Sequence, residues 1–330
     1  MSVIKVAMLS TFALDFFTTL AIAILAVFLG LRLINGHLLL FPTLAILILA
    51  PEYFLPIRNF ASDYHATLNG KNSFHAVRRI LEMPLPKKPT VELHQWTGVD
   101  GLSFENVEFM YPQNGSELTN LDLTVKGNQK IGIIGMSGAG KTTLINLLSG
   151  FLAPTSGQIT IQGKKVTTLD IHDWQKQILY IPQTPYIFAD TLKNNIAFYT
   201  PNVSEDKIKE AIHVVGLDDL VAELPQGLGT MIGSGHRALS GGQAQRIALA
   251  RAFLDPERRV MIFDEPTAHL DIETELELKK RMLPLMENRL VFFATHRLHW
   301  MKQMDYILVL KNGKLIEQGT YQQLLDEHGY

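Results

Sequence analysis

The chain has 330 residues, a length that corresponds to about two domains of ordinary size. Its 30 Lys and Arg residues nearly balance its 32 Asp and Glu residues, and the net charge of −2 argues against a general nucleic-acid-binding protein, which usually carries a basic excess. The lack of cysteine excludes a disulfide scaffold, a thiolate metal site and a cysteine nucleophile. Charge is unevenly distributed, because the only charged residues within 1–57 are Lys5, Asp15, Arg32 and Glu52.

Two apolar stretches near the N-terminus predict membrane helices. Residues 6–31 contain one charged residue, and a helix needs about 20 residues to cross the hydrocarbon core of a bilayer. A short polar break at 32–37 separates them from residues 38–57, which again contain one charge. We therefore expect two transmembrane helices joined by a tight turn. The alternatives are a hairpin buried in a soluble protein and a cleaved signal peptide, which the length of the first stretch and its lack of a cleavage site disfavour.

The residues after the second apolar stretch predict its orientation and the domain boundaries. Basic residues follow it at Arg58, Lys71, Arg78, Arg79, Lys87 and Lys88, so the positive-inside rule places this side in the cytoplasm. Apolar residues keep a helical spacing over 58–82, so the second helix should continue to about Glu82. Three prolines within 84–89 then predict a semi-rigid linker. The expected parts are a membrane region at 1–82, a linker at 83–101 and a cytoplasmic domain at 102–330.

A glycine-rich loop between a strand-like and a helix-like stretch predicts a phosphate-binding site. Residues 130–135 read KIGIIG and suit a buried strand; the loop GMSGAGKTT at 135–143 leads into an apolar helix-like stretch. Glycines let backbone N–H groups approach phosphates, and a helix N-terminus adds a favourable dipole. Lys141 would reach the β- and γ-phosphates and the Thr142 hydroxyl would bind Mg²⁺. The sequence therefore predicts binding of ATP with Mg²⁺.

Two further motifs agree with this prediction, although each also has an ordinary structural interpretation. Residues 260–263 read VMIF, a second buried strand, and end in Asp264, placed to hold Mg²⁺, and Glu265, placed to polarise the attacking water. The ordinary interpretation is an acidic pair at the solvent edge of a strand. The sequence LSGGQ at 239–243 precedes an amphipathic helix, for which Ser240 is a suitable N-cap. On its own this motif indicates no more than a capped helix.

Together with four more motifs, these elements resemble an ATP-binding cassette (ABC) protein over residues 102–330. The four are Tyr111 in FMYP, which matches the aromatic that stacks on adenine, Gln183 in YIPQTP, the D-loop at 268–271, and the switch histidine His296 in FFATHR. The resemblance implies an α/β P-loop ATPase domain with a helical subdomain and an antiparallel β subdomain. It implies catalytic roles for Glu265 and His296, and metal contacts for Thr142, Gln183 and Asp264. It implies nucleotide contacts for Tyr111, Gly135, Ser137, Gly138, Ala139, Gly140, Lys141, Thr142, Thr143, Gln183, Ser240, Gly241, Gly242 and Gln243.

The membrane part narrows the resemblance to CydD-like subunits of CydDC-type thiol exporters. Residues 7–33 and 49–70 resemble the last two transmembrane helices of that subunit. The resemblance implies ATP-driven export of a small thiol, cysteine or glutathione, linked to cytochrome bd assembly. It also implies a multi-pass protein of the cytoplasmic membrane that pairs with a CydC-like half-transporter or with a second copy of itself. In such dimers, Ser240, Gly241 and Gly242 would serve the partner's nucleotide.

The same resemblance leaves two functions open. A half-transporter of this type has six transmembrane helices, whereas this sequence shows two that match the fifth and sixth. The chain is therefore expected to be an ATP-hydrolysing exporter subunit or, alternatively, a truncated remnant that binds ATP and a partner without transport. A soluble ABC ATPase that acts on DNA or ribosomes is disfavoured by the apolar stretches and the near-neutral charge.

Overall fold

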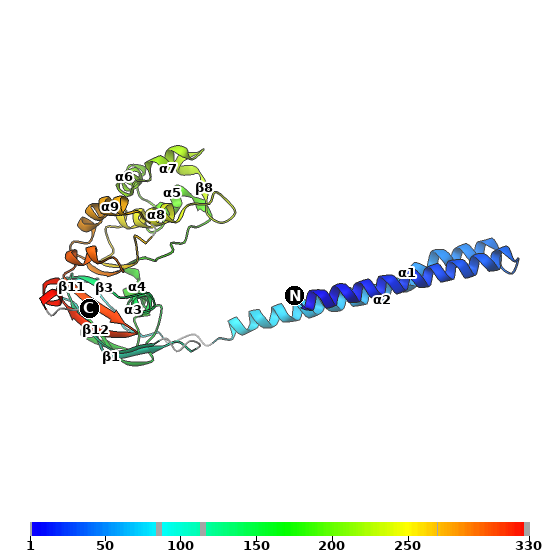
Figure 1. Cartoon of the computed structure of the whole chain (residues 1–330), viewed down its shortest axis with the longest axis horizontal. Coiled ribbons are helices and arrows are strands. Elements are labelled where there is room, and N and C mark those ends of the chain that lie inside the picture. The colour runs from blue at the N-terminus through cyan, green and yellow to red at the C-terminus, as the bar shows by residue number, and fades with distance from the viewer. Residues whose placement is uncertain (1, 84–87, 113–116, 269, 327–330) are drawn as a thin grey trace. The chain divides into compact units, whose positions relative to one another are not determined.

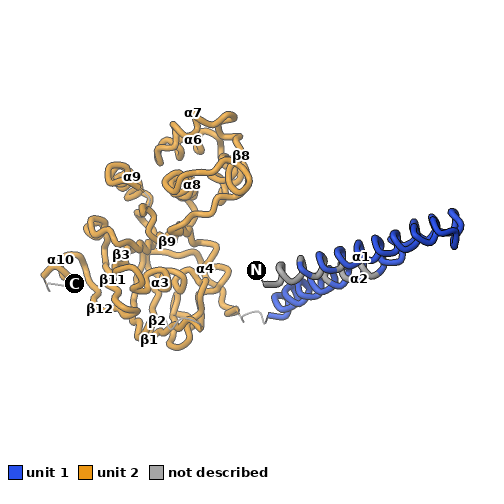
Figure 2. Tube along the Cα trace, turned by 45° about the vertical axis from the view of Figure 1, so that its right-hand side comes forward, with its two compact units in different colours: residues 1–86 blue, residues 87–330 orange. Residues whose placement is uncertain are grey.

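The computed structural model describes residues 2–83, 88–112, 117–268 and 270–326. The chain divides into two compact units, Met1–Pro86 and Lys87–Tyr330 (Figure 2). The first unit is a helical hairpin and the second combines sheets and helices (Figure 1). Each unit is described by itself below. Lys87, one of the basic residues used to predict orientation, lies outside the described residues.

Two long helices, α1 (Ser2–Ile34) and α2 (Leu40–Leu81), pack along each other to form the hairpin. The turn between them falls in the polar break of the sequence. Helix α2 runs without interruption through Pro51 and Pro56. It ends where the backbone N–H of Glu82 donates to carbonyls of the last turn, so one helix covers both the second apolar stretch and its expected extension.

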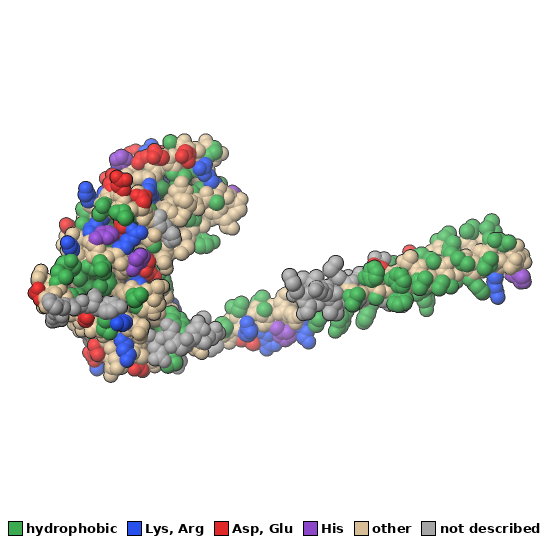
Figure 3. All heavy atoms as spheres, viewed as in Figure 1, with side chains coloured by type: hydrophobic (Ala, Val, Ile, Leu, Met, Phe, Trp, Pro, Cys, Tyr) green, Lys and Arg blue, Asp and Glu red, His purple; other side chains and the backbone are tan. Residues whose placement is uncertain are grey.

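The apolar character of the hairpin supports one full membrane span more clearly than two. Within the described residues, Asp15–Ile34 is long and apolar enough to cross a membrane, with a mean hydropathy of 2.3. The apolar part of α2, Leu40–Pro56, is shorter, because polar residues follow Pro56. Only 6% of the first span is buried, and Figure 3 shows hydrophobic side chains over much of the visible face of the hairpin. This exposure is not that of a hairpin buried in a soluble core.

A six-stranded sheet forms the centre of the second unit, in the order β12–β11–β3–β10–β9–β6. Its strands are parallel except for β12 at one edge. The strands are β3 (Lys130–Ile134), β6 (Ile178–Ile181), β9 (Val260–Asp264), β10 (Leu290–Ala294), β11 (Tyr306–Lys311) and β12 (Lys314–Gly319). Every residue of β9 and β10 is buried, which is why both read as nearly uninterrupted apolar runs.

Different layers cover the two faces of this sheet. Val291 and Phe293 of β10 pack in the same core as α8 (Gly241–Phe253) and α9 (Ile272–Leu285), whereas Phe292 between them packs in the core that contains α3 (Lys141–Leu148). That second core also includes an antiparallel sheet of order β2–β1–β4–β5. Its strands are β1 (Gly101–Met110), β2 (Glu117–Lys126), β4 (Ser156–Ile161) and β5 (Lys164–Val166). The predicted α/β core and antiparallel β subdomain are present.

Short helices around α8 form the predicted helical subdomain, in which α6 packs on α8 (Figure 1). Its elements besides α8 are α5 (Leu192–Ile196), α6 (Glu205–Val215), α7 (Asp218–Glu223), the 3₁₀ turn η1 (Gly227–Gly229) and the short strand pair β7 (Asp190–Thr191) and β8 (Met231–Ile232). The remaining elements of the unit are α4 (His172–Lys176), the 3₁₀ helix η2 (Leu298–Gln303) and α10 (Tyr321–Asp326).

The second unit includes residues that the sequence predicts as linker. Trp96 is only 2% exposed, and its ring meets that of Trp174 with centroids 5.8 Å apart. Its backbone N–H donates to the side-chain oxygen of Gln177 at 2.6 Å, and its indole N–H donates to the carbonyl of Gly127 at 3.0 Å. The folded unit therefore begins well before Leu102, because Trp96 fills part of its core.

Candidate functional site

The predicted site residues gather at the carboxyl ends of three neighbouring parallel strands. The loop at 135–140 follows β3, Glu265 follows β9, and His296 lies two residues beyond β10. Ala294 at the end of β10 pairs in register with Asp264 on one side and with Ile133 on the other. The strand ends therefore meet at one edge of the sheet, the usual place for a ligand in an open α/β fold.

Glycine shapes the loop between β3 and α3. Gly140 precedes the helix with φ 103°, in the left-handed region that side chains avoid, and its carbonyl accepts the N–H of Leu144 at 2.9 Å. A Cβ at Gly135 would come within 2.4 Å of the carbonyl oxygen of Leu310. The loop therefore wraps closely before α3 begins at Lys141. The first N–H groups of a helix have no intrahelical partner, so this turn suits an anion.

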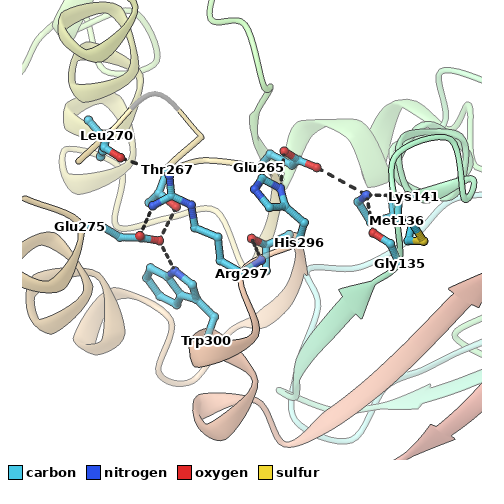
Figure 4. A network of polar contacts seen from close by, with 11 residues as sticks. Gly135, Met136, Lys141, Glu265, Thr267, Leu270, Glu275, His296, Arg297 and Trp300 are labelled. Carbon is cyan, nitrogen blue, oxygen red and sulfur yellow. Dashed lines mark hydrogen bonds and ion pairs between the residues drawn. The ribbon is translucent and has the colours of Figure 1, made fainter. Parts of the chain in front are cut away.

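Lys141 lies 6% exposed at the start of α3, and its ammonium group faces back over the loop. Its Nζ donates to the carbonyls of Gly135 at 2.9 Å and Met136 at 3.2 Å. It also lies 3.4 Å from Oε1 of Glu265, which forms an ion pair (Figure 4). The only groups that hold the ammonium are thus two neutral carbonyls and one carboxylate among the described residues, and phosphate oxygens could take their place.

Asp264 carries a buried carboxylate that suits a bound cation. It is 3% exposed, and its Oδ1 has no hydrogen-bond partner among the described residues. Burial raises the pKa of this carboxyl; the hydrogen bond from Thr142 lowers it, the Glu265 carboxylate raises it again, and the Lys141 ammonium lowers it. A buried acceptor without a partner, next to a hydroxyl, fits a Mg²⁺ ion, which binds one or two carboxylates and completes its shell with phosphate oxygens, water and other oxygen ligands.

Glu265 and His296 form a pair at the mouth of the site. Oε2 of Glu265 lies 3.0 Å from Nδ1 of His296, so Glu265 stands between this imidazole and Lys141 (Figure 4). Glu265 has φ 48°, an unusual left-handed conformation for a residue with a side chain, and its N–H donates to the carbonyl of Ala294 at 2.8 Å. Such conformations concentrate at functional sites. A carboxylate and an imidazole in this contact can orient water and move its proton.

A cavity of about 540 Å³ brings most of the predicted site residues together. It is lined by Met136, Ser137, Gly138, Gly140, Lys141, Thr142, Thr143, Gln183, Glu265 and His296. Ala139 is a buried residue of the loop, and Gly135 contributes its carbonyl to the contact with Lys141. The structure thus places the phosphate-binding loop, Gln183 and the Glu265–His296 pair around one space.

Other predicted residues do not line this cavity among the described residues. The ring of Tyr111 packs against Phe109 with centroids 4.7 Å apart. Ser240 caps α8 in a reciprocal capping box, in which its hydroxyl accepts the N–H of Gln243 and the Gln243 side chain accepts the N–H of Ser240. Gly241 and Gly242 form the first turn of this helix. Of the D-loop at 268–271, His269 lies outside the described residues.

Sequence reasoning missed a buried carboxylate next to this site. Glu275 in α9 accepts hydrogen bonds from Thr267 and Trp300 and pairs with Arg297, directly after His296 (Figure 4). The available signal was an acidic residue on the same helical face as Leu278 and Met282, which are buried in α9. An acidic residue at such a position needs partners from elsewhere in the fold.

The second unit contains a domain of the ABC transporter family. Residues 118–268 match the family described as "ABC transporter", and this stretch contains the phosphate-binding loop, the signature sequence and the end of β9. The fold is similar to that of "a bacterial Atm1-family ABC exporter with ATP bound", with a TM-score of 0.67 and 28% identity over 97% of this chain and 56% of that one. An ABC-type α/β ATPase domain is therefore present.

Two curated relatives indicate which type of ABC transporter this chain resembles. The chain is 54% identical over its whole length to the "Glutathione/L-cysteine transport system ATP-binding/permease protein CydC" of Bacillus subtilis, and covers 57% of that protein. It is 34% identical to the corresponding CydD protein of Escherichia coli, over 98% of this chain and 56% of that one. The predicted resemblance to CydDC-type transporters is confirmed; the sequence indicated a CydD-like subunit, and of these two relatives the CydC protein has the higher identity. The chain spans a little over half the length of these relatives.

Proposed function

We propose that this chain is an ATP-binding/permease subunit of an exporter, in which ATP binding and hydrolysis drive movement of a small thiol. The contacts from Lys141 through Glu265 to His296 within the cavity of the phosphate-binding loop carry this proposal. They join a cation that could bind phosphates, a carboxylate that could accept a proton from water, and an imidazole. ATP hydrolysis coupled to transport is the activity that the family resemblance supports.

Each residue around the cavity has a distinct proposed role. Lys141 exchanges its two carbonyl partners for the β- and γ-phosphates, which also frees Glu265 from its ion pair. Glu265 then accepts a proton from the attacking water, and His296 holds the geometry of attack. Thr142, Asp264 and Gln183 would hold Mg²⁺, which neutralises phosphate charge when bound. Thr143 and the loop residues Gly135 to Gly140 cradle the phosphates.

The signature residues are proposed to act on a partner's nucleotide. Ser240 to Gln243 do not line this chain's own cavity among the described residues, and Ser240 and Gly241 are exposed at the N-terminus of α8. A helix N-terminus exposed in this way can bind phosphate from a second cassette. We propose a heterodimer with the complementary CydC- or CydD-like half, or else a homodimer. Tyr111 would stack on adenine at the margin of the site.

The hairpin is proposed to lie in the cytoplasmic membrane with the ATPase domain in the cytoplasm. Its exposed apolar side chains need lipid or further helices around them, and the basic residues beyond Arg58 favour the cytoplasmic side. Two spans are proposed, although the apolar part of α2 is short and needs flanking residues at the interface. A thiol as substrate rests on the names of the relatives, which mention glutathione and L-cysteine.

The decisive experiment is ATP-driven uptake of glutathione or cysteine by inverted vesicles that contain this chain and a complementary half-transporter. Glu265→Gln should bind ATP and lower hydrolysis by about 10²–10⁴-fold, because an amide cannot accept the proton. Turnover within about threefold of the wild type would refute the role of Glu265. Substrate identity is tested by competition between the two thiols.

A second candidate is an ATP-binding remnant without transport; the chain spans 57% of the length of the Bacillus subtilis CydC protein. Two helices per subunit are too few to enclose a polar pathway in lipid. Uptake should therefore require a polypeptide that supplies the N-terminal part of such relatives. Uptake above the Glu265→Gln background without that polypeptide would refute the remnant function, whereas hydrolysis with no uptake in either preparation would support it.

A further inference from the structure

Glu275 is the centre of a buried network beside the ATPase site. It lies in the first turns of α9 with 1% of its surface exposed. Its Oε1 accepts hydrogen bonds from the Thr267 hydroxyl and from the Trp300 indole N–H, both at 2.7 Å. Its Oε2 accepts from the Arg297 guanidinium (Figure 4). Both carboxylate oxygens are therefore occupied by donors from different segments.

The donors come from the two segments that carry the reactive pair. Thr267 lies two residues after Glu265, and Arg297 directly follows His296. Arg297 also donates to the carbonyl of Leu270 at 3.1 Å, so its planar group joins both segments to α9. Moving either loop by an ångström would stretch at least one of these contacts, and with it the 3.0 Å contact between Glu265 and His296.

The network is charged rather than neutral. Burial raises the pKa of Glu275, but the hydrogen bonds from Thr267, Trp300 and Arg297 and the positive charge of Arg297 outweigh it and hold the pKa below its usual range. His299 adds a ring nitrogen 3.4 Å from Oε1. Buried ionic groups of this kind are often neutral for stability, and a role in fixing one conformation is a reason for a chain to carry one.

We propose that Glu275 is a positioning residue for ATP hydrolysis, which holds the Glu265 and His296 segments in register through Thr267 and Arg297. This inference rests on the proposed roles of Glu265 and His296. Glu275 touches neither nucleotide nor water in this proposal, since its donors occupy both oxygens. Its effect should therefore appear in turnover rather than in ATP affinity.

The test compares Glu275→Gln and Arg297→Lys in the full chain, reconstituted with its partner half in vesicles. Glu275→Gln keeps the shape but removes the charge, and Arg297→Lys keeps the charge but cannot span Glu275 and Leu270 together. Both should lower kcat by about tenfold or more, because a misplacement of an ångström can cost about 10²-fold. KM for ATP and binding of a fluorescent ATP analogue should stay within about twofold.

A control variant and a second background separate positioning from simple loss of stability. Arg281→Lys makes the same change in α9, where the guanidinium spans the carbonyls of His213 and Val214, and should leave kcat unchanged. In a His296→Ala background, Glu275→Gln should lower kcat by less than about twofold, because the contact between Glu265 and His296 that it maintains is already lost. If Glu275→Gln does not fold, Trp300→Phe replaces it, since phenylalanine keeps the ring packed on Phe293 and removes one donor.

The outcomes distinguish this inference from the proposed function. If His296→Ala slows hydrolysis but the folded Glu275, Arg297 and Trp300 variants turn over normally, only the positioning role is overturned. Equal losses from Glu275→Gln in both backgrounds would also overturn it, because they would indicate a structural effect. If His296→Ala itself turns over like the wild type, the proposed role of His296 fails, and this inference fails with it.

Discussion

Asp264→Asn should make the protein more stable in the absence of nucleotide, although it removes a residue that the proposed function needs. The ionised carboxylate is buried, one oxygen has no partner among the described residues, and Glu265 stands next to it. An unsatisfied buried polar group costs about 1–3 kcal/mol, and more if it is charged. Asparagine can still accept from Thr142 but leaves one amide atom unpaired, so we expect a net gain of about 1 kcal/mol at a pH where the carboxyl is ionised.

The gain is measurable by intrinsic fluorescence on heating, because all three tryptophans, Trp96, Trp174 and Trp300, are buried in the α/β unit. About 1 kcal/mol corresponds to a rise of about 2–4 °C in Tm for a unit of this size. The pKa of Asp264 is raised in the folded state. The wild type therefore loses stability as the pH rises from the pKa of the unfolded state, about 3.9, through the higher pKa of the folded state. The variant has no carboxyl at this position and does not show this loss. The difference should be absent below about pH 4 and should grow as the pH rises above it.

Asp100→Asn is a matched control with the opposite sign. Asp100 is also buried, but its Oδ2 accepts from the N–H and hydroxyl of Thr97, both at 2.7 Å, and His94 lies 2.9 Å from Oδ1. Burial raises its pKa, yet these hydrogen bonds outweigh burial and leave the pKa lowered, so this variant should lose stability. A lower Tm for Asp264→Asn, or a gain that persists at pH 4, would refute the reasoning. In the same samples, Asp264→Asn should abolish the Mg²⁺ dependence of ATP binding.

Three more predictions concern the cavity and the signature helix. Lys141→Ala should abolish ATP binding in a titration with a fluorescent analogue, because it removes the ammonium that we propose binds the phosphates; tight binding would show that the phosphates lie elsewhere. His296→Ala should slow hydrolysis and spare binding, and weaker ATP affinity at an unchanged rate would contradict the proposed role. Ser240→Ala should lose about 1 kcal/mol of stability with the capping box, seen in thermal unfolding, and should also weaken ATP-dependent dimerisation in light scattering. Unchanged dimerisation would contradict a contact with the partner's nucleotide.

The parts of the site that could be predicted are those that depend on local rules. A strand, a glycine-rich turn and a helix that begins at Lys141 follow from neighbouring residues alone, and so does the cap of α8 by Ser240. The buried strands at 130–134 and 260–264 read as short apolar runs because layers cover both faces. Their shared edge then follows from the parallel order of the sheet.

The parts that could not be predicted depend on contacts between distant residues. Glu275 reads as one of several acidic residues in α9, and only its partners 8, 22 and 25 residues away make it a buried centre. The segment before Leu102 reads as a linker because prolines and charges precede it, whereas its anchoring hydrogen bond to Gln177 spans 81 residues. Pattern rules identify an extended segment without identifying the surface that it covers.

The packing of Trp96 determines where the ATPase cassette can be separated from the rest of the chain. An ATPase cassette excised at Leu102 would lose the ring that packs on Trp174 and the hydrogen bonds to Gln177 and Gly127. Loss of a buried tryptophan costs about 3–5 kcal/mol, a large share of the roughly 5–15 kcal/mol by which a domain is stable. Hybrids that carry this cassette should therefore be joined near residue 87, so that the cassette keeps Trp96.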